Sequence, residues 1–302
     1  MIKILLGGIY YPMAILRYFE MALQNMDNIK LCTIGSYTGS WIPWRGGMNV
    51  NMKYAKQPDI PLQNMISMGK CPLNPFINQI EEKLDGKPDL FIQVDAGWHF
   101  TNSPYKTVGI ATDPHCLNYD PLRANSSTLY NMQEYYMKGD DVYLPYAYSE
   151  FCHYPIKGRK QIYDTGMIGL AYDTRVQAYN KIKEAGFSIY FSIGEIFDEY
   201  REYINTFFSV INISSLQDLN ARMFEVPAMN IPLIANPLPD TPKFFREYEH
   251  YYPVKGYHEV VDAVRWIKEN PDKATEMSQN AYEKVHPHTY TARIKQILED
   301  QL

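Results

Sequence analysis

Ile2-Lys3-Ile4-Leu5-Leu6-Gly7-Gly8 opens the pattern that decides the fold class. An apolar run of this length, closed by glycines, is typical of a buried strand. Residues 12–26 then repeat apolar side chains at helical spacing, and a second apolar run follows at residues 29–34. This order predicts two parallel strands that are joined by a helix.

Strand-like and helix-like segments continue to alternate along most of the chain, which favours an α/β fold. The pattern is lost only at residues 35–65, where we expect a long loop. In the first half we expect strands at 89–95 and 107–112, and helices at 75–84 and 122–137. In the second half we expect strands at 164–170, 187–191, 208–213, 231–235 and 251–254, and helices at 175–185, 196–205, 219–229, 257–269, 271–284 and 291–302.

The two halves each begin with their own strand, and 302 residues suffice for two domains with separate cores. We therefore expect two Rossmann-like domains. Ligands of open α/β sheets bind at the carboxyl ends of the strands, so the expected site is a cleft that both domains face.

Composition excludes several classes of protein. Hydrophobic residues make up 46% of the chain and charged residues 21%, as in ordinary globular proteins. The net charge is -5, and the densest basic cluster, residues 157–160, is interpreted as a solvated linker. A protein that mainly grips nucleic acid would show a basic face, so the charge disfavours that function.

The four cysteines, Cys32, Cys71, Cys116 and Cys152, show no metal-ligand spacing. No apolar stretch is long enough to span a bilayer or to serve as a signal peptide. We therefore expect a cytoplasmic protein with free thiols and no bound metal.

Gly7 and Gly8 are expected to form a turn between the first strand and the first helix. Glycines at such a turn let a phosphate approach the backbone at the helix N-terminus. The pair is not the GxGxxG motif of dinucleotide-binding proteins, which argues against an NAD enzyme. A donor-binding turn and a merely tight turn both remain open.

The segment from Asn212 to Glu225, Asn-Ile-Ser-Ser-Leu-Gln-Asp-Leu-Asn-Ala-Arg-Met-Phe-Glu, carries the strongest chemical signal. A strand ends in a polar loop, and a helix then places Arg222 and Glu225 on one face. An arginine beside a diphosphate and a carboxylate beside ribose hydroxyls would suit a nucleotide-sugar. From spacing alone, a surface Arg–Glu pair is the commoner explanation.

This segment resembles the C-terminal domain of CgeB-type (spore maturation protein B-like) glycosyltransferases, which are related to the large retaining GT-B families of glycosyltransferase groups 1 and 4. The family pattern there is N-hydrophobic-S…D-L-N-x-R-x-F-E-hydrophobic-x-A. Further segments resemble the family in the same order: residues 89–95, 144–147, 163–169 with Arg175, 257–261 and 288–293.

The resemblance implies a metal-independent hexosyl- or pentosyltransferase of GT-B architecture. Residues 1–155 would bind the acceptor, residues 156–285 the nucleotide-sugar, and a helix in residues 286–302 would return to the N-terminal domain. UDP-sugars are the expected donors, and no cofactor is expected. Arg175 and Arg222 would stabilise the departing diphosphate and Glu225 would hold the ribose, while Asn220 and Gln217 contact phosphate or sugar.

Two positions depart from the family pattern. Gln217 stands where related retaining enzymes carry a first carboxylate, eight positions before Glu225, which puts the details of sugar recognition in doubt. Asn230 stands where the family has glycine at a helix end. Asparagine tolerates the left-handed conformation, so we expect the cap to survive.

In the N-terminal half, Asp113 and His115 follow an expected strand and resemble the family's D-x-H. Such a pair could deprotonate an acceptor hydroxyl, although Asp-Pro-His is also an ordinary turn. Tyr10, Asp95 and His99 are assigned to the acceptor. Asp140 and Asp141 are interpreted as part of a solvated turn.

The expected function is transfer of a sugar from a nucleotide-sugar to an acceptor hydroxyl. Two alternatives stay open. The first is a GT-B-like protein that binds nucleotide or glycan without turnover, which Gln217 motivates. The second is a glycosyltransferase that acts on modified bases in DNA.

Overall fold

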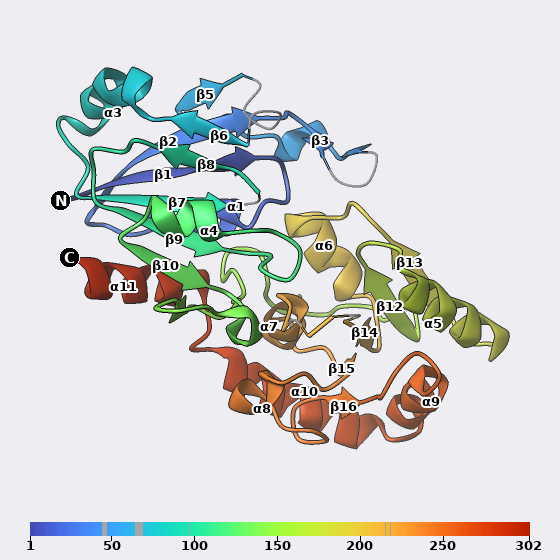
Figure 1. The fold of residues 1–302 in the computed structure, drawn as a ribbon. Coiled ribbons are helices and arrows are strands. Elements are labelled where there is room, and N and C mark those ends of the chain that lie inside the picture. The colour runs from blue at the N-terminus through green and yellow to red at the C-terminus, as the bar shows by residue number, and fades with distance from the viewer. Residues whose placement is uncertain (44–46, 64–68, 96, 215, 218) are drawn as a thin grey trace. The chain divides into compact units, whose positions relative to one another are not determined.

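The computed structural model describes residues 1–43, 47–63, 69–95, 97–214, 216–217 and 219–302. The chain divides into two compact units. The N-terminal unit comprises Met1–Pro145 together with Tyr290–Leu302, and the C-terminal unit comprises Tyr146–Thr289. Each unit contains one parallel sheet that is flanked by helices (Figure 1), so the α/β class is confirmed.

The sheet of the N-terminal unit has seven strands in the described part of the chain, in the order β11-β10-β9-β7-β1-β2-β5. All of its strand pairs are parallel. From β1 the chain first adds β2 and β5 on one side of β1, and it then adds β7, β9, β10 and β11 on the other side. The strand order therefore reverses between β1 and β7. The strands are β1 (Ile2–Tyr10), β2 (Ile29–Tyr37), β5 (Ile60–Leu62), β7 (Leu90–Asp95), β9 (Thr107–Ala111), β10 (Thr128–Asn131) and β11 (Val142–Tyr143).

Gly7 and Gly8 do not form the expected turn, because β1 continues through both of them to Tyr10. A β-carbon on Gly7 would stand 2.8 Å from a ring carbon of Phe91, and one on Gly8 would stand 2.7 Å from the carbonyl oxygen of Val94. The glycines therefore allow close packing inside the sheet. The donor role expected of Gly7 and Gly8 depended on a turn that would bind a phosphate, and the two glycines do not form that turn.

The expected helix at 122–137 is also wrong. Its residues form helix α4 (Asp120–Ala124), strand β10 and the 3₁₀ helix η3 (Glu134–Tyr136). In β10, Thr128 pairs with Val108 of β9, so these residues complete the sheet. A threonine and a tyrosine in this short run fit a pleated sheet better than a helix.

The turn at Asp140 and Asp141 is only partly solvated. Asp141 is 8% exposed, and its two carboxylate oxygens accept hydrogen bonds of 2.9 Å from Nε and Nη2 of Arg123. The amide of Asn131 and the backbone N–H of Lys138 donate to the same carboxylate. Asp141 therefore fastens α4 and β10 to the turn.

The expected loop at 35–65 contains more regular structure than its composition suggests. Strand β2 continues to Tyr37, β3 (Trp41–Ile42) and β4 (Met48–Asn49) pair as a hairpin, and η1 (Met52–Tyr54) follows. Strand β5 then joins the sheet at its edge, where Pro61 is tolerated because an edge strand needs fewer backbone donors. A further short pair joins β6 (Lys70–Pro72) to β8 (His99–Thr101).

Helices α1 (Leu16–Gln24) and α3 (Ile77–Leu84, preceded by η2, Asn74–Phe76) pack on β1 and β2. The last helix, α11 (Tyr290–Gln301), packs on α1. The buried Tyr290 stacks on Tyr18 with ring centroids 5.1 Å apart. The buried Arg293 donates from Nε to the carbonyl of Pro145 at 2.7 Å, which ties α11 to the end of this unit.

The C-terminal unit has a five-stranded parallel sheet in the order β13-β12-β14-β15-β16. From β12 the chain first adds β13 on one side of β12, and it then adds β14, β15 and β16 on the other side. The strand order therefore reverses between β12 and β14. The strands are β12 (Thr165–Ile168), β13 (Ile189–Ser192), β14 (Val210–Asn212), β15 (Leu233–Ala235) and β16 (Tyr252–Pro253). The helices are α5 (Asp173–Glu184), α6 (Phe197–Ile204), α7 (Arg222–Ala228), α8 (Thr241–Phe244), α9 (Val260–Glu269) and α10 (Pro271–Val285).

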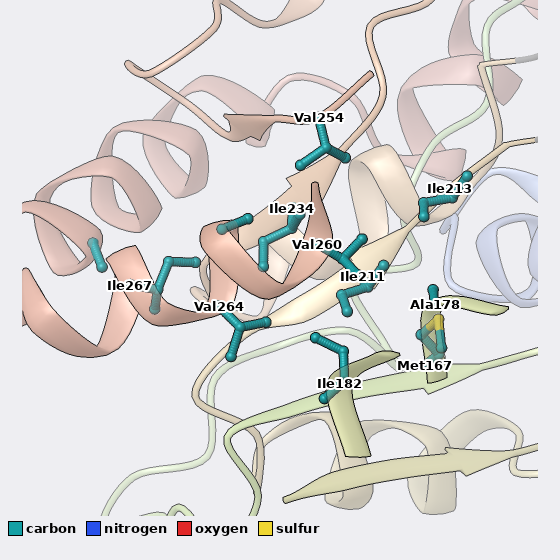
Figure 2. Packing of buried hydrophobic residues seen from close by; sticks show 12 residues of the cluster. Met167, Ala178, Ile182, Ile211, Ile213, Ile234, Val254, Val260, Val264 and Ile267 are labelled. Carbon is teal, nitrogen blue, oxygen red and sulfur yellow. The ribbon is translucent and has the colours of Figure 1, made fainter. Parts of the chain in front are cut away.

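Figure 2 shows the hydrophobic cluster that packs α5 and α9 on this sheet. Ile211 of β14 and Ile234 of β15 meet Ile182 of α5 and Val264 of α9. Side chains alternate along a strand, so the neighbours of Ile211 and Ile234 point to the other face. Helix α7 packs against β14 and β15, and α10 packs against α7.

In the part of the chain that the structure describes, no helix combines the length and the apolar character that crossing a membrane requires.

Candidate functional site

The reversal between β12 and β14 is where an open parallel sheet is expected to bind a ligand. Arg175, in the first turn of α5, spans this point. Its Nε donates to the carbonyl of Ile213, just after β14, at 3.3 Å, and its Nη1 donates to the carbonyl of Leu170, just after β12, at 3.1 Å. Its guanidinium also lies 5.2 Å from the ring centroid of Tyr172. These contacts hold a buried cation at the carboxyl edge of the sheet.

Gly169, directly after β12, brings a second cation to the same point. Its φ is +145°, a conformation that favours glycine. A β-carbon here would stand 3.0 Å from Cζ of Arg222 and 3.1 Å from Nη1 of Arg175. Two guanidinium groups therefore lie against one glycine, where a ligand with two negative charges would be bound strongly.

The polar loop before α7 fixes Arg222. Asn212, the last residue of β14, and Asn220 exchange side-chain hydrogen bonds of 3.1 and 3.2 Å. Oδ1 of Asn220 also accepts the backbone N–H of Arg222 at 3.1 Å. Asn220 thus shapes the loop from within, and its expected contact with phosphate or sugar stays a prediction.

Glu225 lies one helical turn after Arg222 and is 8% exposed. Burial raises the pKa of this carboxyl, while Arg222 and the hydroxyl of Tyr200 act in the opposite direction. The Arg–Glu pair is therefore not a solvated surface pair, which was the commoner explanation of its spacing. A buried carboxylate beside one cation is suited to accept hydroxyl hydrogen bonds from a ligand.

The end of α7 behaves as expected. Asn230 has φ of +55°, so the expectation that asparagine adopts the left-handed cap is confirmed. Arg159 donates to the carbonyls of Met229 and Asn230 at 3.2 and 3.1 Å. This arginine belongs to the basic segment that was interpreted as a solvated linker, and its guanidinium instead satisfies the last carbonyls of the helix.

Gln217 lies exposed in the loop between β14 and α7. Its neighbours at 215 and 218 lie outside the described residues. Ser214, nearby, is fastened by Asn236, whose Oδ1 accepts the backbone N–H of Ser214 at 2.8 Å. The sugar contact expected of Gln217 stays a prediction.

The N-terminal unit places Asp113 and His115 on one turn after β9. The hydroxyl of Thr112 donates to Oδ2 of Asp113 at 3.0 Å, while Nδ1 of His115 lies 3.3 Å from Oε1 of the buried Gln133. The hydroxyl of Tyr119 accepts the backbone N–H of Asp113 at 3.0 Å. These hydrogen bonds run to different partners, and the catalytic role of the two residues stays a prediction.

Tyr10 is the last residue of β1, and Tyr11 follows it. Tyr10 is 1% exposed, and its hydroxyl lies among Arg17, Glu20 and Thr33, beneath α1. Burial raises the pKa of Tyr11, and the charge of Asp113 raises it further, so Asp113 lies within electrostatic range of Tyr11. Both tyrosines are buried, so burial does not distinguish them, and the acceptor role expected of Tyr10 stays a prediction. Tyr11 was not among the residues predicted from the sequence.

The remaining acceptor residues lie in two successive strands, β7 and β8, which belong to different sheets. Asp95 ends β7, but its side chain lies outside the described part of the structure. His99 begins β8 and is 9% exposed; burial and Lys70 both lower the pKa of its imidazole. Their roles stay predictions. Within the described ranges, no group of three or more His, Cys, Asp or Glu side chains is arranged to hold a metal ion.

Sequence comparison identifies one family. Residues 176–299, less than half of the chain, match a family described as glycosyl transferase-like. No curated protein matches the sequence significantly.

Structure comparison gives neighbours over the full length. Sucrose-phosphate synthase from Thermosynechococcus elongatus has a TM-score of 0.62 at 12% identity, with 99% of each chain covered. An alpha-glucosyltransferase in complex with UDP and a 13-mer DNA containing an A:G mismatch also has a TM-score of 0.62, at 10% identity and 99% coverage of each chain. A putative UDP-N-acetylglucosamine 2-epimerase from Listeria monocytogenes has a TM-score of 0.56 at 12% identity, covering 98% of this chain and 95% of the other. The chain therefore has the GT-B fold, and within it residues 176–299 are similar to the glycosyl transferase-like family.

Proposed function

We propose that this protein transfers a sugar from a nucleotide-sugar donor to an acceptor hydroxyl. The observation that carries the proposal is the convergence of Arg175 and Arg222 on Gly169, at the reversal point of the C-terminal sheet. The family match, which contains Arg222 and Glu225, supports glycosyl transfer. The finer assignment to the CgeB-type enzymes is part of the proposal.

The two arginines suit the diphosphate of such a donor. When the bond between the anomeric carbon and the diphosphate oxygen breaks, the electron pair stays on that oxygen, and negative charge grows there. The acceptor oxygen forms the new bond to the anomeric carbon, and its proton passes to a base, for which His115 is the candidate. Arg175 and Arg222 are already in place, so they stabilise the leaving group without further reorganisation. Two fixed cations offer this stabilisation without a metal ion, which is the basis of the proposed metal independence.

Glu225 is proposed to accept hydrogen bonds from the ribose hydroxyls. It lies one turn from Arg222 on α7, so a ribose next to the diphosphate would lie within its reach. A hydrogen bond to a charged group contributes about 1.5–3 kcal/mol. We propose UDP-sugars as the first donors to test, because structural neighbours were solved with UDP or with UDP-glucose.

The findings do not favour the two alternatives from the sequence. Binding without turnover was motivated by Gln217, which the structure places in an exposed loop without assigning it a role. For the DNA-modifying alternative, neighbours with bound DNA share only the fold with this chain at about 10% identity.

The test begins with a thermal-shift screen against UDP-, GDP-, ADP- and CDP-sugars, since a ligand that binds only the folded state raises the melting temperature. Glu225→Gln and Arg222→Ala should then lose the shift. Arg265→Ala is the matched control, because Arg265 is exposed on α9 and pairs with Asp262, three residues earlier on the same helix, at 2.6 Å. Nucleoside diphosphate release with a candidate acceptor measures turnover. The proposal fails if no nucleotide-sugar shifts the wild type, or if both site variants shift as the control does.

A further inference from the structure

Glu225 is surrounded by groups from three segments of the C-terminal unit. Arg222 precedes it on α7, Tyr200 reaches it from α6, and His153 reaches it from the segment before β12. Glu225 and Tyr200 are under 10% exposed, and His153 is 1% exposed. The carboxylate is therefore held in a dry environment by one cation and two aromatic side chains.

The tautomer of His153 follows from its hydrogen bonds. Nδ1 accepts the backbone N–H of Ser149 at 3.0 Å. Burial, helped by the nearby charge of Arg201, lowers the pKa of this imidazole to about 3. The ring is therefore neutral at physiological pH and carries its hydrogen on Nε2. Nε2 lies 3.9 Å from Oε1 of Glu225, so the positive end of an N–H dipole lies beside the carboxylate.

Tyr200 offers a second neutral donor. Its ring meets that of His153 edge to face, with centroids 5.8 Å apart and planes at 83°. Its hydroxyl is buried, has no hydrogen-bond partner among the described residues, and lies within electrostatic range of Glu225 and Arg222. Burial first, and then the charge of Glu225, raise the pKa of the phenol well above its ordinary value. Tyr200 therefore stays protonated and offers an unsatisfied O–H donor in the surroundings of Glu225.

Burial by itself would favour a protonated, neutral Glu225, which would accept ribose hydrogen bonds less strongly. Neutral hydrogen-bond donors favour the ionised carboxylate and still leave it able to bind the ribose. A lysine in their place would form an ion pair with the carboxylate and would compete with the ligand. We infer that Tyr200 and His153 are positioning residues, which keep the Glu225 carboxylate ionised and aimed at the ribose hydroxyls of the donor. The inference rests on the ribose role proposed for Glu225.

The first test removes only the hydroxyl of Tyr200. In Tyr200→Phe, nucleotide affinity at pH 8 should fall about 2- to 10-fold, because a buried polar group near the Glu225 carboxylate is lost. The hydroxyl of Tyr200 favours the charged form of Glu225, so its loss should raise the pKa of Glu225. On acidification, the variant should therefore begin to lose nucleotide affinity at a higher pH than the wild type does. Tyr203→Phe is the matched control, since Tyr203 lies on the same helix but is 38% exposed and stacks on Tyr190. Calorimetric titration with UDP from pH 5 to pH 8 measures both quantities.

The second test uses His153→Asn. The amide oxygen of asparagine can still accept the N–H of Ser149, while the donor that faces Glu225 is lost. His250→Asn is a close control, because Nδ1 of His250 likewise accepts a backbone N–H four residues earlier, from Arg246 at 2.8 Å, and its Nε2 lies 3.6 Å from Glu249. We expect the pH dependence of nucleotide binding to move in His153→Asn and to stay unchanged in His250→Asn.

Glu225→Gln distinguishes failure of the ribose role of Glu225 from failure of the positioning role of Tyr200 and His153. If this variant binds the nucleotide as the wild type does, the ribose role and the positioning inference both fail. If it binds weakly while Tyr200→Phe and His153→Asn keep the wild-type affinity and pH profile, the ribose role stands and the positioning inference is overturned. Should His153→Asn not fold, the Tyr200→Phe titration decides the inference by itself.

Discussion

Cζ of Arg222 lies 3.0 Å from the position that a β-carbon on Gly169 would take. The absence of a side chain after β12 is therefore what lets the guanidinium reach the carboxyl edge of the sheet. Glycine is required at position 169 for two reasons: it adopts φ of +145° without strain, and it leaves the space for the guanidinium open.

Gly169→Ala should lower both the stability of the protein and its affinity for the nucleoside diphosphate, and a control glycine distinguishes the two effects. Backbone strain should cost roughly 1–3 kcal/mol of unfolding free energy, and the displaced guanidinium should lower nucleoside diphosphate affinity roughly 10-fold or more. Gly186→Ala is the control, because Gly186 has φ of +82° and open space around its α-carbon. Urea unfolding and calorimetry should show a stability loss in both variants and an affinity loss only in Gly169→Ala. Equal affinities would exclude Gly169 from the site.

Asp141→Asn should destabilise the N-terminal unit by about 1.5–3 kcal/mol, because Asp141 accepts two hydrogen bonds from Arg123 in a buried place. Asp120→Asn, which changes a carboxylate that is 61% exposed and also contacts Arg123, should cost under about 1 kcal/mol. Urea unfolding at pH 7 compares the two variants. Equal losses would show that burial of Asp141 adds nothing.

The same carboxylate predicts a pH dependence. Burial by itself would raise the pKa of Asp141, but hydrogen bonds from Arg123, Lys138 and Asn131 hold it below its ordinary value. The stabilisation is therefore fully present above the unfolded pKa of about 4, and it is lost as the pH falls through the lower folded pKa. The stability advantage of the wild type over Asp141→Asn should shrink below pH 4. An advantage that grows on acidification would contradict the sign of this shift.

His115→Ala tests the proposed base in the N-terminal unit. If His115 takes the acceptor proton, transfer should slow by roughly 10²- to 10⁴-fold while nucleotide affinity is unchanged. His258→Ala, which removes an exposed histidine of the C-terminal unit, should leave both unchanged. Rates of nucleoside diphosphate release at saturating donor provide the comparison. Near-normal transfer with intact acceptor affinity would remove Asp113 and His115 from the catalytic residues.

Local patterns predicted most of the C-terminal unit because nearly every strand and helix there carries its own signal, although the four-residue helix α8 was not expected. The strand at 210–212 and the helix from Arg222 both follow from apolar spacing, and the left-handed cap at Asn230 follows from side-chain chemistry. The run at 122–137 misled the prediction because a short strand and a short helix together had the length of one helix. Only pairing with β9, a contact distant in sequence, distinguishes the two.

The candidate site could be predicted only where one segment contained its residues. Arg222 and Glu225 share a helix turn, and spacing with the family resemblance therefore singled them out. Tyr200 and His153 reach Glu225 from segments distant in sequence, and neither belongs to a motif. Likewise, Gly7 and Gly8 looked like a phosphate turn because nothing in the sequence shows that Phe91 and Val94 pack against them.

Calorimetric titration of the wild type and of Arg222→Ala with UDP and with uridine tests the central claim most directly. Because Arg222 is proposed to meet the diphosphate, the variant should bind UDP about 10- to 100-fold more weakly, and both proteins should bind uridine equally. Arg265→Ala should match the wild type with both ligands. If UDP does not bind, GDP, ADP and CDP are titrated with their nucleosides in the same way. Equal affinity of wild type and Arg222→Ala for the diphosphate that binds, or no binding by any of the four, would contradict the account.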